Sequence, residues 1–380
     1  MDYQKKYKAK LIVDGVNSMK EIINCINDAQ HTIRIRMFMW RDDNSGRKII
    51  EELQNKIISN PQIKIFIEKD SFGSLVYNIQ KWVTFGSLGG DIFASNYGLG
   101  FITNNKNVEF SLVGSKSVLF FKYLKENDHS KVLLFDEFMP GSRVLIGGMN
   151  ISDEYLIAQN HELPNSGGRH DYMVKIEGRI ADNFASYGGK YSKKWLTKKI
   201  LEGVEVIMSI KNKHSIRKEI LKELSRAKKS VIIEHGYITD FSIIKKLRKI
   251  SSKGVNIKII LPNYSDGVWH ANIHSIYKIL KPSAIANNRI NNIEVFLYKG
   301  MIHAKVMVID EKVAIIGSAN LTYGSFDILN ETNAIFRQKD GVVKELLIQL
   351  DTDIKNCEKI TLNNIPKYNK WFAKFQKIFI

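Results

Sequence analysis

Two segments of the sequence carry the same residue types at the same spacing: a histidine, a lysine two positions later and an aspartate five positions after the lysine. The repeated residues are His129, Lys131 and Asp136 in the first copy, and His303, Lys305 and Asp310 in the second. Residues two apart on a strand face the same side, so each histidine should project together with its lysine. The duplication predicts a site with two imidazoles and two ammonium groups.

A turn of small residues and an asparagine follow each copy. The first turn contains Gly148 and leads to Asn150, and the second contains Ser318 and leads to Asn320. Backbone amides without bulky side chains can approach an anion closely, and asparagine adds neutral donors. We therefore expect the two copies to form a single phosphate-binding site.

Paired histidines suit phosphoryl chemistry. One imidazole can attack phosphorus while the other protonates the departing alkoxide. Lysines can neutralise the phosphate oxygens, so the reaction does not require a metal ion. The sequence thus predicts phosphoryl transfer without a metal or another cofactor.

A single histidine and lysine at this spacing could equally be a core imidazole and a surface ammonium on a strand. The duplication argues against that interpretation. The aspartates differ in kind, because Asp136 and Asp310 lie at an odd offset from their histidines, near strand ends. We expect both to be structural and to fix the turn that follows.

The regions around the two motifs show a second, coarser repetition. In both halves of the chain, stretches with apolar residues at helical spacing are followed by strand-like stretches. The predicted helices cover residues 22–29, 46–58, 220–227 and 242–252, and the predicted strands cover residues 32–40, 63–68, 230–234 and 255–261. This alternation predicts an α/β fold with two similar halves, each a mixed β-sheet flanked by helices.

The double H-x-K-x4-D pattern resembles the signature of the phospholipase D superfamily, and the resemblance extends roughly from Leu11 to Phe336. It implies halves related by pseudo-two-fold symmetry, one active site at their interface and a phosphohistidine intermediate. It also implies that His129 is the nucleophile and His303 the general acid.

The same resemblance implies roles for further residues. Asp171 and Glu331 look like the carboxylates that orient the catalytic histidines, and Ser318 is similar to a phosphate-binding serine. The predicted catalytic residues are His129, His303, Lys131, Lys305, Asp171 and Glu331, and the predicted phosphate-binding residues are Asn150, Asn320, Ser318 and Gly148.

Within the superfamily, several stretches resemble bacterial cardiolipin synthases, especially the soluble kind. They are residues 38–46, 147–155 and 176–178, and the pair Lys194 and Trp195. Three features depart from that pattern: the typical N-terminal membrane helices are absent, Ser130 replaces a common basic residue, and residues 318–322 also resemble the nuclease branch. The resemblance implies phosphatidyl transfer to an alcohol such as phosphatidylglycerol, or to water. A nuclease or phosphodiesterase acting on DNA or RNA is the alternative, and a scaffold that retains the motifs is a third.

Composition is compatible with both enzyme classes. Lysine and arginine number 57 against 39 acidic residues, a net charge of +18 that attracts nucleic acid or anionic lipid. Cys25 and Cys357 are far apart in sequence and indicate neither a disulfide framework nor a zinc site. No apolar run approaches the roughly 20 residues that cross a bilayer. We expect a cytoplasmic protein that associates peripherally with the inner membrane.

The repeats divide the chain into a first half at residues 1–202, a second half at residues 203–365 and a tail at residues 366–380. An insertion rich in aromatic residues and glycine occupies about residues 71–127 of the first half. It could line an acyl-chain channel or touch a bilayer, or it could be a subdomain with its own small core.

The tail has the pattern of a basic amphipathic helix. Lys370, Lys374 and Lys377 lie on one side, and Trp371, Phe372, Phe375, Ile378 and Phe379 lie on another. Such a helix can lie on an anionic membrane surface, or it can dock on the domain with solvated lysines. Basic residues beside exposed aromatics could also line a nucleic-acid groove, but the family features favour lipid.

Overall fold

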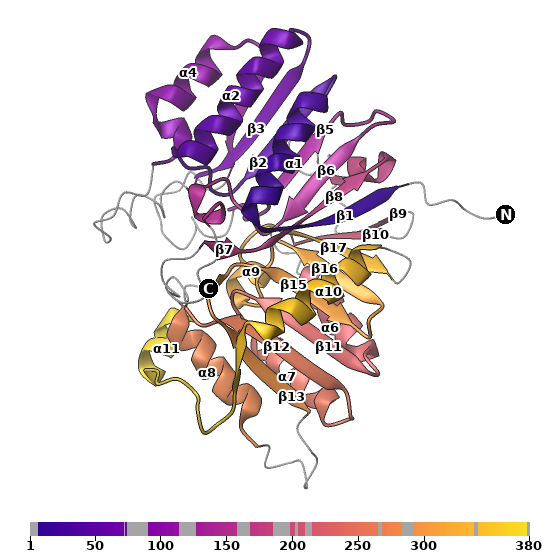
Figure 1. Cartoon of the computed structure of the whole chain (residues 1–380), viewed down its shortest axis with the longest axis vertical. Helices are drawn as coiled ribbons and strands as arrows, with labels where there is room; N and C mark the ends of the chain where they lie inside the picture. The colour runs from indigo at the N-terminus through magenta and orange to yellow at the C-terminus, as the bar shows by residue number, and fades with distance from the viewer. Residues whose placement is uncertain are drawn as a thin grey trace, which may run out of the picture.

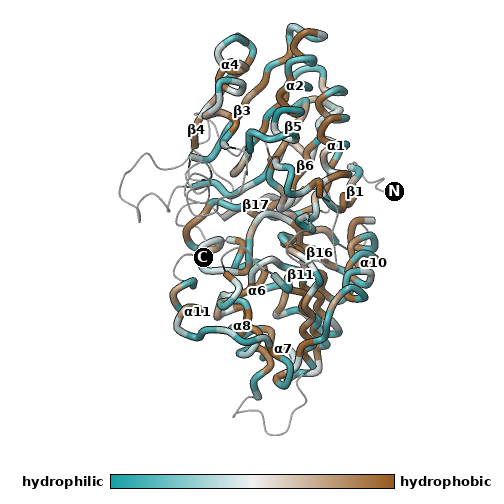
Figure 2. Tube along the Cα trace, turned by 60° about the vertical axis from the view of Figure 1, so that its left-hand side comes forward, coloured by the Kyte–Doolittle hydropathy of each residue, from teal (hydrophilic) through white to brown (hydrophobic). Residues whose placement is uncertain are grey.

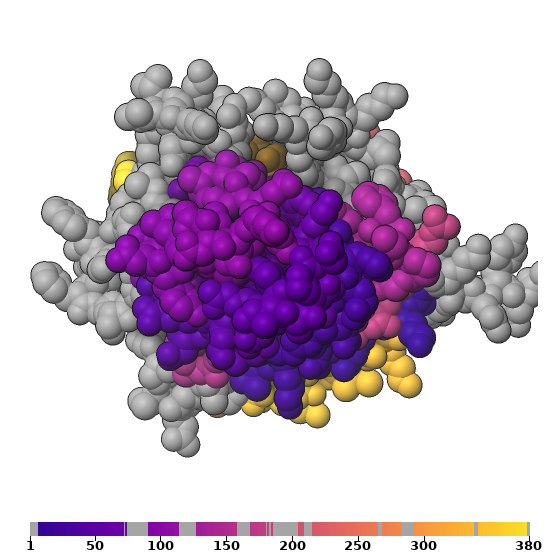
Figure 3. Space-filling view, turned by 90° about the horizontal axis from the view of Figure 1, so that it is seen from above, coloured from indigo at the N-terminus to yellow at the C-terminus, as the bar shows by residue number. Residues whose placement is uncertain are grey.

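The computed structural model describes residues 7–71, 73, 90–113, 127–157, 168–184, 198–201, 204–209, 215–264, 268–282, 292–337 and 341–377. Figure 1 shows two lobes, one from each half of the chain, with β7 near their junction. Seen from above, residues of the first half cover most of the view, and yellow residues of the second half show at its edge (Figure 3).

Each lobe is built on a sheet. The first has the order β1-β8-β6-β5-β2-β3-β4 and the second the order β18-β13-β12-β11-β15-β16-β17-β10-β9. The strands of the first sheet are β1 (Lys8–Val13), β2 (Thr32–Met37), β3 (Lys64–Asp70), β4 (Val108–Val113), β5 (Val132–Phe135), β6 (Arg143–Gly147) and β8 (Tyr172–Glu177). The strands of the second are β9 (Lys198–Leu201), β10 (Val204–Ser209), β11 (Ser230–His235), β12 (Asn256–Pro262), β13 (Ile293–Tyr298), β15 (Lys305–Ile309), β16 (Val313–Gly317), β17 (Glu331–Arg337) and β18 (Cys357–Ile360).

The two sheets repeat one topology. The run β1-β8-β6-β5-β2-β3-β4 corresponds strand by strand to β10-β17-β16-β15-β11-β12-β13. In both runs the first four contacts are antiparallel and the last two are parallel. The second sheet is extended by β18 and by β9, which precedes the predicted boundary at residue 202. A further short ladder pairs β7 (Arg169–His170) with β14 (Met301–Ile302) and joins the halves.

Most of the helices cover one face of each sheet. The helical segments of the first half are α1 (Asp14–Asp28), α2 (Asn44–Ser59), η1 (Ile92–Ala94), α4 (Asn96–Asn104), η2 (Asp153–Tyr155) and η3 (Arg179–Phe184). Those of the second are α6 (Ser215–Arg226), α7 (Phe241–Ser251), α8 (Trp269–Leu280), α9 (Tyr323–Asp327), α10 (Gly341–Lys355) and α11 (Lys370–Gln376). Side-chain caps start several of them; for example, Asp43 accepts from Gly46 N before α2 and Asp240 accepts from Ile243 N before α7. Hydrophobic and hydrophilic residues alternate along the helices in Figure 2, as expected for helices with one buried face.

The opposite faces of the two sheets pack on each other. In β5, Leu133 and Phe135 pack in the helix-covered core of the first half, whereas Val132 and Leu134 pack in a core shared by both halves. Because alternate residues of a strand face opposite sides, the chain forms four main layers, helix, sheet, sheet and helix. Helix α10, through Val342, Leu346 and Leu350, and segment η3, through Ala181 and Phe184, instead pack in the shared core. The predicted α/β class and its two similar halves are confirmed, with one refinement: most helices cover one face of each sheet, and the second face packs on the other sheet together with α10 and η3.

The motif aspartates hold turns, but different ones from those expected. Asp136 accepts hydrogen bonds from the backbone amides of Gln30 and His31 at 2.9 and 2.7 Å, just before β2. Asp310 likewise accepts from Lys229 N at 2.7 Å, just before β11. The prediction that each aspartate fixes the turn after it is therefore corrected, because each carboxylate caps the turn that leads into the neighbouring strand.

The described part of the insertion, residues 90–113, belongs to the first half. Its strand β4 pairs with β3, and Phe93 and Phe101 are buried in the helix-covered core. The Phe93 ring packs 4.8 Å from that of Phe110. The described part therefore belongs to the core of the first half and does not form a subdomain with its own small core. Tyr97 is 40% exposed, and the remaining aromatics of the insertion lie outside the described residues.

The tail docks through one side and exposes the other. Gln376 accepts a hydrogen bond from Ala271 N at the start of α8 at 3.0 Å, and Ala373 is buried. Trp371, Phe372 and Phe375 are 80%, 47% and 53% exposed. Ile378 and Phe379 lie outside the described residues. Among the helices that the structure describes, none combines the length and hydrophobicity needed to span a bilayer.

Candidate active site

The two repeated histidines lie just before β5 and β15, near the boundary between the sheets. His129 and His303 are 8% and 6% exposed. The backbone amide of His129 donates to Asn330 O at 2.9 Å, and that of His303 donates to His170 O at 2.8 Å. Each histidine is thus held by the main chain of the opposite half.

Each histidine also has its carboxylate partner in the opposite half. His129 Nδ1 lies 3.0 Å from Glu331 Oε1, and His303 Nδ1 lies 2.8 Å from Asp171 Oδ2. Both carboxylates are fully buried. A carboxylate on Nδ1 fixes the tautomer and leaves Nε2 as the reacting nitrogen. The structure therefore brings together the predicted histidines and carboxylates in pairs that cross between the halves.

Both motif lysines lie beside their own histidines. Lys131 Nζ donates to the carbonyl oxygen of His129 at 2.5 Å, and Lys305 Nζ donates to that of His303. Burial lowers the pKa of Lys131 to about 7, and the nearby Lys305 contributes in the same direction. A phosphate anion between the two ammonium groups would favour their charged forms.

Burial also changes the other titratable groups. It raises the pKa of Asp171 to about 7, against the opposing effect of Lys305. It lowers the pKa of His129 even though Glu331 acts in the opposite direction. For His303, burial and then Lys305 lower the pKa well below its ordinary value. In the free site both imidazoles are therefore biased toward the neutral form, His303 more strongly.

The predicted phosphate-binding residues occupy different surroundings. The Ser318 hydroxyl donates to the Glu331 carboxylate and so supports the His129 pair, and its contact with phosphate remains a prediction. Asn150 Oδ1 accepts from Met39 N at 3.1 Å. Within the described part of the chain, Asn320 Oδ1 is buried without a hydrogen-bond partner.

Two aromatic residues that the sequence did not single out complete the site. The Phe38 ring contacts that of His129 edge-on at 4.7 Å, and Lys131 Nζ lies 5.0 Å from its centroid. The Tyr155 hydroxyl lies 3.1 Å from His303 Nδ1, and Asn150 Nδ2 donates to it at 3.4 Å. The sequence signal for them is that they belong to residues 38–46 and 147–155, the stretches that resemble cardiolipin synthases.

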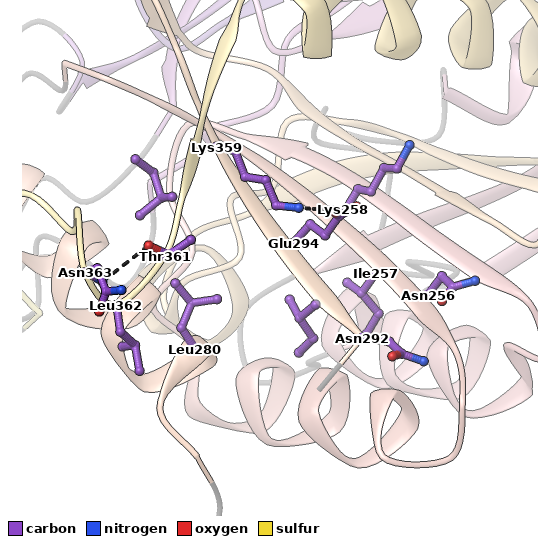
Figure 4. A pocket seen from close by; sticks show the side chains of 12 residues that line it. Asn256, Ile257, Lys258, Leu280, Asn292, Glu294, Lys359, Thr361, Leu362 and Asn363 are labelled. Carbon is purple, nitrogen blue, oxygen red and sulfur yellow. Dashed lines mark hydrogen bonds and ion pairs between the residues drawn. The ribbon is translucent and has the colours of Figure 1, made fainter. Parts of the chain in front are cut away.

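A cavity of about 760 Å³ lies elsewhere, between the beginnings of β12 and β13 and the end of β18 (Figure 4). Lys258, Glu294 and Lys359 line it, and Lys359 forms an ion pair with Glu294. None of the predicted catalytic residues lines it, so this cavity is separate from the histidine site.

Gly148 allows a close approach between the first turn and Asp171. A Cβ atom at this position would lie 2.5 Å from Asp171 Oδ1. We expect Gly148→Ala to displace Asp171 from His303 and to lower the rate of phosphodiester cleavage at least about 100-fold, because orienting carboxylates contribute that much or more. The control is Gly141→Ala, whose Cβ would meet nothing within 4 Å. Thermal unfolding checks that both variants fold, and a fully active Gly148→Ala protein would contradict the geometry.

Comparisons with known proteins agree with this arrangement. Residues 220–355 match the family model described as "Cardiolipin synthase, PLD-like domain". Cardiolipin synthase 1 of Staphylococcus epidermidis is 25% identical over 376 residues, which cover 93% of this chain and 69% of the relative. Cardiolipin synthase of Clostridium perfringens is 26% identical over 397 residues, with 96% and 74% covered.

A solved structure supports the fold over nearly the whole chain. Phosphatidylserine synthase of Haemophilus influenzae has a TM-score of 0.70 and 14% identity, and the match covers 98% of this chain and 92% of that one. At this identity the match establishes the fold alone. The family model and the relatives show that the second half contains a phospholipase D-like domain of the cardiolipin synthase type, and that this chain is an enzyme of this type.

Proposed function

We propose that this protein is a phosphatidyltransferase of the cardiolipin synthase type, which moves a phosphatidyl group from one phospholipid to an alcohol, phosphatidylglycerol, or to water. The main support is the arrangement of two histidine–carboxylate pairs, each joining the two halves, with two buried lysines beside them. Similarity to cardiolipin synthases along most of the chain supports the lipid substrate.

In the first step, Nε2 of one histidine attacks phosphorus. A P–N bond forms, the P–O bond to the leaving alcohol breaks, and the second histidine gives its proton to the departing oxygen. Lys131 and Lys305 stabilise the charge that develops on the phosphoryl oxygens.

In the second step, the neutral second histidine takes the proton of the incoming alcohol. The alcohol oxygen attacks phosphorus, the P–N bond breaks and the first histidine is released. Neither step requires a metal ion, because the lysines supply the positive charge and the histidines move the proton. Hydrolysis follows when water replaces the alcohol.

The assignment of the nucleophile is a separate proposal. The family resemblance favours His129 as nucleophile and His303 as general acid. The order of the pKa values in the free site favours the reverse, since the pKa of His303 is lowered further and this histidine is more readily neutral. Only direct trapping of the intermediate can separate the two assignments.

We also propose that the protein associates peripherally with an anionic membrane surface through α11. Its exposed Trp371, Phe372 and Phe375 suit insertion at the lipid headgroup level, and Lys370 and Lys374 lie on the same short helix. The net charge of +18 would add long-range attraction to anionic lipid.

Both histidines should be required. We expect His129→Ala and His303→Ala each to lower cardiolipin formation from labelled phosphatidylglycerol by about 10²–10⁴-fold. EDTA should have no effect, and His31→Ala, which changes an exposed side chain, should be fully active. Cleavage of labelled DNA together with no reaction on lipid would instead favour the nuclease alternative.

Rapid quenching and peptide mapping should locate the phosphohistidine. We expect it on the peptide with His129, and its presence only on the peptide with His303 would reverse the roles. Because one imidazole must start neutral and the other protonated, the rate should rise with pH as the nucleophile loses its proton and fall as the acid loses its own. A profile with a single limb over the whole pH range in which the protein stays folded would contradict this division of roles.

The exposed aromatics of α11 can be tested without removing the helix, since Gln376 helps it dock on α8. We expect combined substitution of Trp371, Phe372 and Phe375 by alanine to weaken binding to phosphatidylglycerol vesicles at least about tenfold. Phe241→Ala is the matched control, because Phe241 is 67% exposed on a different helix. Equal vesicle binding by the triple variant and the unchanged protein would show that α11 is only a docked structural helix.

A further inference from the structure

A second buried polar cluster lies directly behind the His303 pair. Its centre is Tyr172, whose hydroxyl lies 2.7 Å from Glu234 Oε2, 2.7 Å from Asp353 Oδ2 and 3.0 Å from His170 Nε2. His170 Nδ1 lies 2.6 Å from Asp14 Oδ1. Tyr172 and His170 belong to the first half and Glu234 and Asp353 to the second, so the cluster joins the halves.

The distances require an extra proton. A tyrosine hydroxyl has one hydrogen and can donate it to only one of the two carboxylates. The other carboxyl must therefore be protonated and donate to the hydroxyl oxygen. Burial raises the pKa of Glu234 to about 8, which is consistent with a protonated acid at this position.

His170 carries the positive charge of the cluster. Burial opposes that charge, but Glu234 in its ionised form and the hydrogen bonds to Asp14 and Asp353 outweigh it and raise the pKa of His170 well above its ordinary value. When Glu234 is protonated, Asp14 and Asp353 supply the negative charge. Its ring also stacks on Tyr298 with a centroid distance of 5.5 Å. The titratable groups around His170 are Asp14 of α1, Tyr172 of β8, Glu234 of β11, Tyr298 of β13 and Asp353 of α10.

This cluster is connected to the catalytic pair through one residue. The carbonyl of His170 accepts the hydrogen bond from His303 N, and the next residue, Asp171, binds the His303 ring. The ladder of β7 with β14 fixes the same segment. We propose that His170 is a positioning residue: its imidazolium, held by Glu234, Asp353 and Asp14 across the two halves, sets the position of Asp171 against His303. This proposal rests on the proposed role of the His303 site in catalysis.

The first half has a buried ion pair at the position in its sheet that corresponds to Glu234. Arg36 occupies in β2 the position that Glu234 occupies in β11, since they are opposite Val132 and Val306 in the neighbouring strands. Arg36 forms an ion pair with Asp128 at 3.3 Å, and Asp128 directly precedes His129. A buried ionic contact thus lies one residue away from each catalytic pair, with different residue types in the two halves.

A metal site is the competing interpretation. His170, Glu234 and Asp353 offer ligand atoms that all lie within 4.8 Å of one another. However, Nδ1 of His170 faces Asp14 and Nε2 faces the Tyr172 hydroxyl, and an imidazolium has no lone pair for a metal. The positive charge of His170 already does what a cation would do in this cluster.

A double-mutant cycle separates positioning from general support of the fold. The probe is short-chain phosphatidyl-p-nitrophenol, whose cleavage is read from released nitrophenolate and does not depend on an alcohol acceptor. We expect His170→Gln to slow cleavage at least about 30-fold in the unchanged protein. On an Asp171→Asn background the same substitution should slow it less than about threefold, because that contact is already lost.

Glu331→Gln is the matched background, since it weakens the other catalytic pair. There, His170→Gln should again slow cleavage at least about 30-fold, because the two changes act on different histidines. The positioning role would be overturned if His170→Gln slowed cleavage by the same factor on both backgrounds. It would also be overturned if His170→Gln had no effect in the unchanged protein. His31→Gln controls for the substitution, and thermal unfolding measures stability for every variant.

Glu234→Gln gives a second test. A glutamine amide can donate to the Tyr172 hydroxyl as the protonated acid does, so this variant should keep cleavage within about threefold at pH 7, whereas Glu234→Ala should not. Stoichiometric metal in the purified protein that is lost in Glu234→Gln would overturn the proposal in favour of a metal site. If the unchanged protein cleaves the nitrophenyl ester but forms no cardiolipin, the proposed function fails while this cycle still reports on His170.

Discussion

Two hydrogen bonds between histidine and carboxylate cross the boundary between the halves, and the site depends on both. Glu331 of the second half binds His129 of the first, and Asp171 of the first half binds His303 of the second. Neither half alone supplies both members of either of these two pairs. We infer that the halves must be packed together before either histidine has a defined tautomer.

The packing of the sheets supplies this constraint. Alternate residues of the central strands fill a core shared by the two sheets, and main-chain bonds from His129 to Asn330 and from His303 to His170 align the crossing segments. Burying charged groups costs free energy unless they are paired. In this site, contacts among the lysines, carboxylates and imidazoles offset that cost. The altered pKa values of Lys131 and Asp171, both about 7, follow from the same burial.

Much of the fold was predictable from the sequence because it is duplicated. The predicted helix at residues 46–58 is observed as Asn44–Ser59, and the predicted strand at residues 230–234 as Ser230–His235. Strand alternation and helical spacing are local properties, so they can be recognised without knowledge of the tertiary structure. The layer order was less accessible, since two sheets that pack face to face give the same apolar pattern as sheets covered by helices on both sides.

The site was predicted only as a set of residues. The sequence indicated the histidines, lysines and carboxylates, but not that each carboxylate serves the histidine of the other half. Tyr155 and the cluster around His170 were missed, because their partners are brought together by the packing of the halves and no spacing encodes such contacts. The turns capped by the motif aspartates were misassigned for the same reason, since the capped amides lie about a hundred residues away for Asp136.

The crossed pairing can be tested most directly by proton and nitrogen NMR of protein labelled with ¹⁵N-histidine. The ring Nδ1–H of His129 and that of His303 should each show the low-field position of a hydrogen bond to a carboxylate. We predict that Glu331→Gln shifts only the His129 signal and that Asp171→Asn shifts only the His303 signal. If each substitution instead moved the signal of the histidine in its own half, the pairing across the boundary would be wrong.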